Sequence, residues 1–332
     1  MKIAIVILNW NGKKLLKQFL PSVLEHSASD QVSFYVVDNA STDDSVNFLN
    51  KHYPHISLIE HPSNLGYARG YNEALKQIDA DIYCLLNSDV AVSENWLWPI
   101  REIFTKNPET AIIQPKIRAY KQPDQFEYAG AGGGFIDALG YPYCRGRIFD
   151  TLEIDQGQYD DEIDIFWASG ACFFIRASVF KALKGFDSHY TAHQEEIDLC
   201  WRAHNQGFGV KYTGASTVYH VGGATLESAN PRKTFLNFRN SLFNLVKNLP
   251  SAQLIPTVFT RLVLDGLAGL RYLTTGKTGH FLAVLKAHAS FYYYLPNMIQ
   301  KRGGLTPQKH AHRVKSIVWA YFIRKKRRFN DL

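Results

Sequence analysis

Polar side chains follow three apolar runs near the start of the chain, each at the point where the run ends. The residues are Asn9 and Asn11, Asp38 and Asn39, and Asn87, Ser88 and Asp89. Taken singly, each is better explained as a helix cap or a turn former than as a site residue. Ligands of open α/β sheets bind beyond the carboxyl ends of the strands, so three such groups on consecutive segments favour a binding site.

Asp89 is the strongest candidate for holding a metal ion. The segment Cys84–Asp89 runs from an apolar strand directly into this acidic residue. A carboxylate there can bind a hard divalent cation, which in turn can hold phosphate oxygens. The chain has no Gly-x-x-x-x-Gly-Lys-Ser/Thr loop and no Gly-x-Gly-x-x-Gly after its first strand, which argues against P-loop and dinucleotide-binding folds. A metal is therefore the expected means of neutralising a diphosphate.

Three carboxylates, Glu195, Glu196 and Asp198, occupy four positions at the start of an expected helix. A favourable interaction with the helix dipole explains one acid easily and three less well. Crowded carboxylates raise one another's pKa values, which suits a general base. His220 ends a β-rich run. A lone histidine is more often structural, and it gains functional weight if it faces Asp89.

The elements that must position these residues alternate along the first 115 residues. Expected strands cover Ile3–Leu8, Val32–Val37, Ile56–Glu60, Ile82–Leu86 and Ala111–Pro115. Expected helices cover Lys13–His26, a segment capped by Ser41 or Thr42 that runs to Leu49, and Tyr67–Ile78. Strands alternating with helices at this spacing predict an α/β fold with a mostly parallel, doubly wound sheet.

The pattern changes twice further along. Residues 118–165 are rich in glycine and aromatic residues and predict irregular or hairpin structure. Short elements follow, with strands expected at Phe173–Ile175, Val210–Tyr212 and Thr217–His220 and helices at Ser178–Leu183 and Glu195–Asn205. Beyond Pro231 only helices are expected, including an amphipathic one in which Ile255, Phe259, Leu262, Val263, Leu267 and Leu270 recur at helical spacing.

Charge divides the chain into an acidic body and a basic tail. The overall net charge is +7, but residues 231–332 hold 18 Lys and Arg against 2 Asp and Glu. Such a tail, which includes the run Arg324–Arg328, predicts an anionic partner, either phospholipid or nucleic acid. No nucleic-acid-binding motif accompanies it, so an anionic membrane surface is preferred. The four cysteines lack disulfide-like spacing and no secretory signal is evident. These features favour the cytoplasmic side of the membrane.

Eight motifs, in order, resemble those of the inverting family 2 glycosyltransferases, which have the GT-A fold, and in particular their rhamnosyltransferase-like branch. The motifs are Val6–Gly12, Val36–Asp43, Asn64–Asn72, Leu85–Asp89, Ala168–Cys172, Gly185–Asp187, Glu195–Arg202 and His220–Gly223. The resemblance covers residues 1–245. It implies a nucleotide-binding half at 1–115 and an acceptor and catalytic half at 116–245. Residues 246–332 are then a basic, amphipathic, membrane-associating extension.

The resemblance also implies roles for individual residues. The nucleotide-sugar site would comprise Asn9, Asn11, Asp38, Asn39, Asn64, Gly66, Arg69, Asn72, Asn87, Ser88 and Arg239. Asp38 would contact the base, while Asp89 and His220 would hold Mg²⁺ or Mn²⁺ against the diphosphate. Glu196 would be the catalytic base, with Glu195 as the alternative and Asp198 as a supporting or acceptor-binding acid.

Two positions depart from the family pattern. The usual Asp-x-Asp reads Asn87-Ser88-Asp89 here, which leaves one carboxylate, and the usual Glu-Asp pair reads Glu195-Glu196.

The expected function is inverting transfer of a sugar from a nucleotide-diphosphate sugar, by analogy dTDP-rhamnose, to a hydroxyl of a glycan or lipid-linked glycan. Two alternatives remain at this point. A nucleotidyltransferase acting on nucleotide sugars would release pyrophosphate rather than a nucleoside diphosphate. A catalytically inactive, membrane-bound interaction protein would have no need of Asp89, His220 or the acid cluster.

Overall fold

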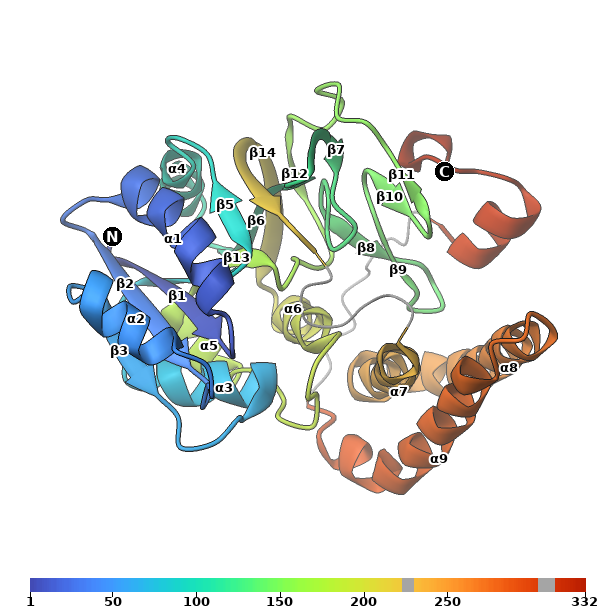
Figure 1. Cartoon of the computed structure of the whole chain (residues 1–332). Helices are drawn as coiled ribbons and strands as arrows, with labels where there is room; N and C mark the ends of the chain where they lie inside the picture. The colour runs from blue at the N-terminus through green and yellow to red at the C-terminus, as the bar shows by residue number, and fades with distance from the viewer. Residues whose placement is uncertain (223–229, 304–313) are drawn as a thin grey trace.

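The computed structural model describes residues 1–222, 230–303 and 314–332, and it begins with the parallel strands that the sequence predicts. These strands are β1 (Ile3–Asn9), β2 (Val32–Asp38), β3 (Ser57–Glu60) and β4 (Ile82–Asn87). β1 lies between β2 and β4, with Asn9 opposite Asp38 and Leu8 opposite Asn87. The polar residues that follow the three strands therefore emerge at one edge of the sheet (Figure 1).

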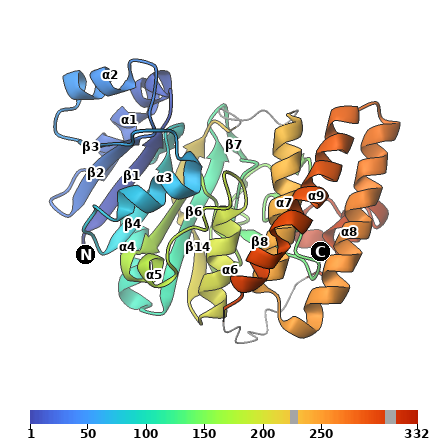
Figure 2. The same ribbon diagram turned by 90° about the horizontal axis from the view of Figure 1, so that it is seen from below.

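Helices cover both faces of this sheet because its strands are apolar on both sides. Ile3, Ile5 and Ile7 of β1 pack in one core cluster, and Ala4 and Val6 pack in the other. The first cluster also contains residues of α1 (Lys13–Ser27), α2 (Ser45–His52) and α4 (Leu97–Lys106). The second contains residues of α3 (Gly66–Leu75), α5 (Ala177–Ala182) and α6 (Glu195–Asn205). Figure 2 shows the two layers from below.

The second half of the sheet is mixed rather than parallel. β13 (Cys172–Arg176) is antiparallel to both β4 and β6 (Thr110–Ala119), and β14 (Gly209–His220) runs parallel to β6. The short strands β5 (Val90–Val92), β7 (Gln122–Phe126) and β12 (Glu162–Asp164) complete a ten-stranded sheet within the described residues. β14 is one strand where the sequence predicted two, because a register shift between Thr213 and Thr217 interrupts the apolar pattern without ending the strand.

Residues 118–165 contain hairpins, as predicted. A separate four-stranded sheet consists of β8 (Gly134–Ile136), β9 (Pro142–Cys144), β10 (Arg147–Ile148) and β11 (Thr151–Leu152). Phe329, near the end of the chain, packs against Phe135 and Tyr143 of this sheet. The C-terminal tail is therefore anchored to the body rather than extended into solvent.

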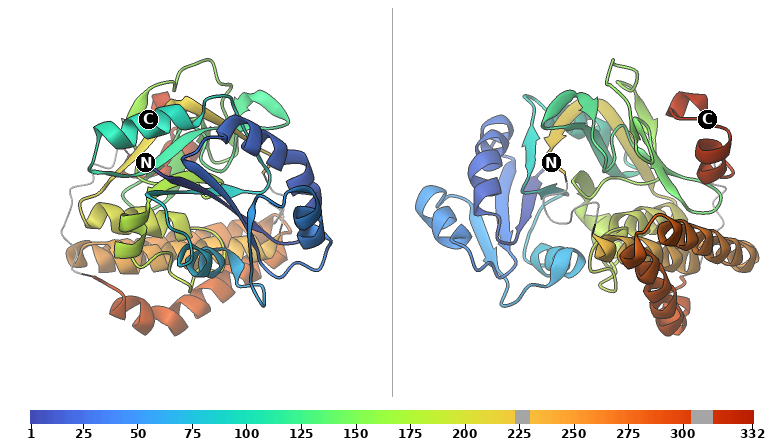
Figure 3. Two further views of the ribbon diagram at one scale, coloured as in Figure 1. Left: turned by 90° about the vertical axis from the view of Figure 1, so that its left-hand side faces the viewer. Right: turned by 45° about the vertical axis from the view of Figure 1, so that its right-hand side comes forward.

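Three long helices follow the sheet: α7 (Pro231–Asn248), α8 (Ser251–Thr274) and α9 (Thr278–Gln300). α7 lies against α6 and α9, and α8 lies against α9 (Figure 3). Residue 245, the predicted domain boundary, falls inside α7, where Leu245 and Val246 belong to the same core cluster as the sheet. A short π-helical turn (Trp319–Ile323) and a 3-10 turn (Phe329–Asp331) end the chain. Among the described residues, no helix is long and apolar enough to cross a membrane.

Candidate active site

Asn9 and Asp38 form a buried polar pair at the ends of β1 and β2. The Asn9 amide donates to Asp38 Oδ1 at 3.0 Å, and the Ser41 backbone amide donates to Asp38 Oδ2 at 2.8 Å. Asn9 is fully buried, yet its Oδ1 atom has no hydrogen-bond partner. A Cβ atom at Gly12 would lie 2.3 Å from that oxygen, so the glycine keeps the space beside it clear. A buried acceptor without a partner at the ligand-binding edge is a suitable contact for a ligand donor.

Ser41 and Thr42 do not cap a helix, which corrects the prediction. The Ser41 hydroxyl accepts from the Asn9 side chain at 3.2 Å and from the Asn11 backbone at 2.8 Å, and α2 begins only at Ser45. Asn11 adopts a φ of +52° and its Oδ1 accepts the Thr42 amide at 2.7 Å. The polar residues of this loop bind the strand ends to one another, so local competition for hydrogen bonds delays the helix.

Asn39 fixes the loop that precedes α3. Its amide donates to Asn64 Oδ1 at 3.0 Å and to the Gly66 carbonyl at 3.1 Å, while its Oδ1 accepts the Leu65 amide at 2.9 Å. Gly66 has a φ of +72°, and a Cβ atom there would lie 3.1 Å from the Thr191 carbonyl oxygen. Both features require glycine. Arg69 is exposed on the first turns of α3.

Asn72 contacts the backbone of the Gly185–Asp187 turn, and its predicted role in nucleotide binding stays a prediction. Its amide donates to the Phe186 carbonyl at 2.8 Å, and its Oδ1 accepts the Phe186 amide at 2.9 Å. Both polar ends of the side chain are therefore used to hold the Gly185–Asp187 turn against α3. The motif position matches the family pattern, but the contacts are those of an internal clamp.

Replacing Asn72 with alanine is expected to destabilise the fold by about 1–3 kcal/mol, because two partly buried backbone groups of Phe186 lose their partner. Urea unfolding measures this change. Lys76→Ala, directly after the last residue of α3, is the matched control, because its side chain is 67% exposed and surface substitutions change stability little. Unchanged stability together with lost nucleotide binding would return Asn72 to the ligand site.

Asp89 and His220 meet at the centre of this edge. His220 Nε2 lies 3.2 Å from Asp89 Oδ1, and His220 Nδ1 lies 3.4 Å from Glu127 Oε2. All three side chains are more than nine-tenths buried. Burial alone would lower the pKa of His220, but the hydrogen bonds and charges of Asp89 and Glu127 outweigh it and raise the pKa to about 10. Gly223, the last residue of the His220 motif, lies outside the described residues.

This group fits a divalent cation that is shared with a ligand. Among the described residues, no set of three His, Cys, Asp or Glu side chains is arranged to hold a metal by itself. Mg²⁺ in phosphate sites typically takes only one or two protein ligands, and water and phosphate oxygens complete its shell. Asp89 would supply an oxygen ligand and His220 a nitrogen ligand. A metal-bound histidine nitrogen carries no proton. Binding of the cation at His220 Nε2 would therefore release the proton that faces Asp89.

Glu127 is a site residue that the sequence analysis missed. It lies in the irregular segment after β7, and its Oε2 accepts the Ala129 amide at 2.5 Å. Gly222 has a φ of +71°, and a Cβ atom there would come within 2.6 Å of Glu127 Oε1. The only signal in the sequence is a single acid in a glycine-rich stretch, which does not indicate a partner.

The acid cluster reaches the same edge through Gly170. The Tyr67 hydroxyl donates to the Gly170 carbonyl at 2.9 Å, and a Cβ atom at Gly170 would lie 3.9 Å from the Glu196 carboxyl carbon. The next residue, Ala171, accepts the Asn87 amide at 2.9 Å. Glu196 therefore lies close to Gly170, and the adjoining Ala171 is hydrogen-bonded to Asn87 at the strand end that precedes Asp89.

The two neighbouring glutamates have raised pKa values but differ in exposure. Burial raises the pKa of Glu196 to about 7, although its side chain remains partly accessible. Burial and the charge of Glu196 raise the pKa of Glu195 well above its usual value, and Glu195 is only 4% exposed. A general base needs a pKa near the working pH and access to its substrate. Glu196 meets both requirements better than Glu195.

The backbone before these acids is strained and is held in place by a side chain of α7. His193 and Gln194 adopt φ values of +66° and +71°, a conformation that non-glycine residues rarely adopt. The Asn240 amide on α7 donates to the carbonyls of Ala192 and His193 at 3.0 and 2.7 Å. Strained residues of this kind persist where the surrounding structure enforces them, and they cluster at active sites.

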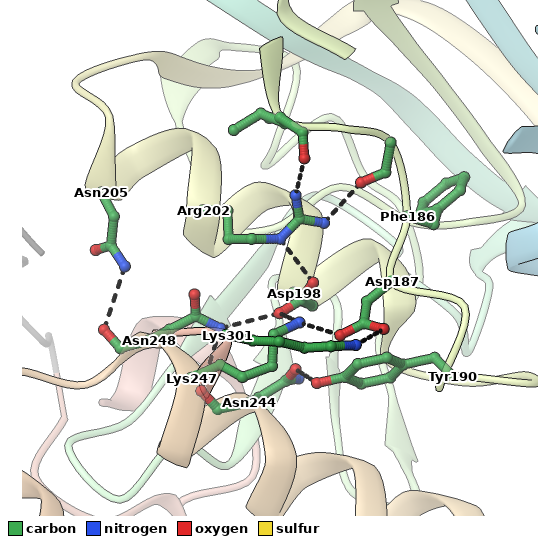
Figure 4. A network of polar contacts seen from close by, with 12 residues as sticks. Phe186, Asp187, Tyr190, Asp198, Arg202, Asn205, Asn244, Lys247, Asn248 and Lys301 are labelled. Atoms are coloured by element: carbon green, nitrogen blue, oxygen red, sulfur yellow. Dashed lines mark hydrogen bonds and ion pairs between the residues drawn. The ribbon is translucent and has the colours of Figure 1, made fainter. Parts of the chain in front are cut away.

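Asp198 has a different environment from its two neighbours. Its side chain is fully buried and pairs with Arg202 at 2.8 Å and with Lys247 at 2.6 Å (Figure 4). Burial opposes ionisation, but these two cations hold the pKa of Asp198 below its usual value. Lys247 also pairs with Asp187 at 2.8 Å. Asp198 thus lies within an ion-pair network, away from the partly open position that Glu196 occupies.

That network shows a second feature that the sequence analysis missed. Asn240, Asn244, Lys247 and Asn248 recur at spacings that place them on one face of α7. Asn244 accepts from Tyr190 at 2.6 Å, and Asn248 donates to Asp198 at 3.1 Å. A polar stripe on an otherwise buried helix was the available signal. This stripe joins the C-terminal helices to the acid cluster.

Arg239 also lies on α7, next to this stripe. Its Nε donates to Asn240 Oδ1 at 2.9 Å, and its guanidinium lies 5.0 Å from the ring of Phe235 and 5.2 Å from the ring of Phe243. The side chain is 8% exposed. These contacts are packing contacts, and a ligand role for Arg239 stays a prediction.

Comparison with known proteins gives a consistent result. The model of the family described as "Glycosyl transferase family 2" matches residues 4–183. An N-acetylglucosaminyl-diphospho-decaprenol L-rhamnosyltransferase of Mycobacterium tuberculosis is 26% identical over 234 residues, which are 65% of this chain and 75% of the relative. The O-antigen biosynthesis protein RfbC of Myxococcus xanthus is 24% identical over 66% of this chain but only 17% of its own length.

Solved structures share the fold at low sequence identity. S. aureus TarS 1-349 in complex with UDP-GlcNAc superimposes with a TM-score of 0.56 at 15% identity, covering 91% of this chain and 82% of the other. A mannosyltransferase from Pyrobaculum calidifontis in complex with GDP-Man and Mn²⁺ gives a TM-score of 0.55 at 13% identity, covering 88% and 87%.

Proposed function

The chain belongs to glycosyl transferase family 2 and is a glycosyltransferase that uses a nucleotide-sugar donor. From this premise we propose that it transfers one sugar, with inversion, to a hydroxyl group of a glycan carried on a lipid. The observation that carries the proposal is the Asp89–His220 pair beyond the carboxyl end of β4, with the partly accessible Glu196, whose pKa is raised to about 7, close to Gly170.

Each part of the site has a defined task in the proposed reaction. Asp38 and Asn9 bind the nucleotide base and ribose. Asp89 and His220 hold Mg²⁺ or Mn²⁺, which neutralises charge on the diphosphate when it is bound. Glu196 takes the proton of the acceptor hydroxyl. That oxygen bonds to the anomeric carbon as the bond from this carbon to the diphosphate oxygen breaks, and the electron pair leaves with the nucleoside diphosphate.

The proposed donor and acceptor are taken from the named activity of a relative. The M. tuberculosis relative is named for rhamnosyl transfer to a diphospho-decaprenol glycan, which supports dTDP-rhamnose as the donor and a lipid-linked glycan as the acceptor. The four cysteines are free and buried, which suits a reducing compartment and thus transfer on the cytoplasmic side of the membrane.

A panel of nucleoside diphosphates and their sugars is expected to distinguish the donor by thermal stabilisation. A ligand that binds only the folded state at about 100 times its Kd adds about 2.7 kcal/mol to the free energy of unfolding. dTDP and dTDP-rhamnose should raise Tm in the presence of Mn²⁺ and much less in the presence of EDTA. If only another nucleotide raises Tm, the donor is reassigned to that nucleotide. If no member of the panel raises Tm, the proposed nucleotide-sugar site is contradicted.

Product analysis separates the proposed reaction from its rival. A glycosyltransferase releases a nucleoside diphosphate, whereas a nucleotidyltransferase releases pyrophosphate. Chromatography of a reaction with radiolabelled dTDP-rhamnose and an extract of lipid-linked glycans should show dTDP and a labelled lipid fraction. Pyrophosphate in place of dTDP would overturn the proposal.

A further inference from the structure

Two charged residues of α8 face inward, while six of its large apolar side chains are exposed. Arg261 is 2% exposed and Asp265 is fully buried, whereas Ile255 is 78% exposed and Phe259 is 68% exposed. The other exposed apolar residues on this helix are Val263, Leu267, Leu270 and Leu273. Their spacing of three and four residues places them along one side of the helix. Surface helices of soluble proteins normally show the reverse arrangement.

The inward polar residues fix the helix in this orientation. The Arg261 guanidinium donates to the Leu139 carbonyl at 3.0 Å and to the Ser241 hydroxyl at 2.7 Å, and it lies 3.6 Å from the centre of the Tyr141 ring. The Tyr141 hydroxyl donates to Asp265 at 3.2 Å. Turning α8 about its axis would break these buried contacts, so the outward apolar face is a specified feature of the fold.

α9 extends the same apolar surface. It packs against α8, and its exposed apolar side chains are Leu282, Leu285, Tyr292, Tyr293 and Ile299. We call the exposed apolar side chains of α8 and α9 together the outer face. Exposed large apolar side chains gathered on two packed helices indicate a binding surface. Tyrosine, with an apolar ring and a polar hydroxyl, is enriched where membrane meets water.

The exposed charges of α8, α9 and the turn between them are all positive. Asp265 is the only acid in α8 and α9, and it is buried, while Arg271, Lys277 and Lys286 are exposed. The guanidinium of Arg271 lies 5.2 Å from the ring of Phe322, which brings the end of α8 against the segment that leads into the basic run Arg324–Arg328. Basic residues near an anionic leaflet each contribute to binding.

The exposed apolar side chains and the positive charges together indicate which partner covers the outer face. A symmetric dimer would place the outer face of one copy on that of another, and the basic residues around it would then repel each other. A membrane that contains anionic lipid satisfies both the apolar and the charged parts. We infer that the outer face of α8 and α9 lies in the interfacial region of an anionic membrane, with the adjoining basic run on the lipid headgroups.

This arrangement deepens the proposed function, because a docked enzyme meets a lipid-linked acceptor without extracting it. The inference itself rests on the outer face alone. Vesicle binding can be measured without donor or acceptor. A failure of membrane binding and a failure of sugar transfer are therefore distinguishable.

The test is sedimentation of the full chain with phosphatidylcholine vesicles that contain or lack phosphatidylglycerol. Wild-type protein should bind the anionic vesicles, and more weakly at high salt. The double variant F259S/L267S should bind them about tenfold or more weakly, because it removes two large apolar side chains from the lipid contact. Trp98→Ser is the matched control, because this side chain is 65% exposed on α4, far from α8 in the fold, and it should bind like wild type.

Two further measurements make every outcome decisive. Far-UV circular dichroism and nucleotide-dependent Tm shifts verify that both variants fold. Light scattering after size exclusion reports the oligomeric state. The inference is overturned if F259S/L267S binds vesicles as well as wild type does. It is also overturned if W98S reduces binding as much as F259S/L267S does. Failure of the wild-type chain to bind vesicles also overturns it. If the wild type is then a dimer that F259S/L267S dissociates, the outer face is a dimer interface. If it is a monomer, the outer face binds another protein.

Discussion

Asp89→Ala is expected to lower kcat/KM by about 1,000-fold or more, because it removes the carboxylate that we propose holds a charge-neutralising metal against the leaving diphosphate. The preceding residues of the motif, Asn87 and Ser88, are neutral and cannot replace the lost carboxylate. His220 would keep Glu127 as a charged partner at 3.4 Å, so the fold should survive. Steady-state transfer assays across a Mn²⁺ titration measure the loss.

Glu94→Ala provides the control for this variant. Glu94 is an exposed acid five positions further along the chain, and its removal should leave transfer unchanged. Turnover by Asp89→Ala equal to wild type at saturating Mn²⁺ would contradict the metal role. A loss accompanied by a large fall in Tm without ligand would show that Asp89 acts through stability instead.

Glu196→Gln is expected to slow transfer by about 100- to 10,000-fold, the range typical of a lost general base. Donor binding should persist, because glutamine preserves the shape of the side chain and Asp38, Asp89 and His220 are untouched. The loss should therefore fall on kcat, with the nucleotide-dependent rise in Tm retained.

The pH dependence of kcat/KM tests the same residue independently. The base must be ionised, and burial raises the pKa of Glu196 to about 7. Activity should therefore rise as pH increases through about 7, and this limb should vanish from the residual activity of Glu196→Gln. Glu195→Gln is the comparator, because Glu195 is more deeply buried. If Glu195→Gln loses the limb and Glu196→Gln keeps it, the base is Glu195.

The sequence predicted the strands of the first 90 residues well. Expected and observed strands agree within a residue or two for β1, β2, β3 and β4, because each is an apolar run whose period and ends are set by near neighbours in the chain. The direction of β13 and the continuity of β14 were not predictable in this way. Both depend on which strand lies alongside, and pairing partners are remote in sequence.

Identities and spacing in the sequence were enough to place Asp38, Asn87 and Asp89 at strand ends and to mark Glu195, Glu196 and Asp198 as a cluster. Only the tertiary structure separated that cluster. Lys247, far along the chain, holds Asp198 as an ion pair, while burial leaves Glu196 with a raised pKa. The environment of a charge is created by groups that folding brings to it.

The outer face illustrates the same division. The spacing of Ile255, Phe259 and Leu267 by itself determined that α8 has an apolar side, because helical periodicity is local. Whether that side faces the core or the solvent was decided by the body of the protein, where Tyr141 and Ser241 hold the charged side of α8 inward. Periodicity is a property of one segment, whereas orientation depends on contacts between segments that only the folded chain contains.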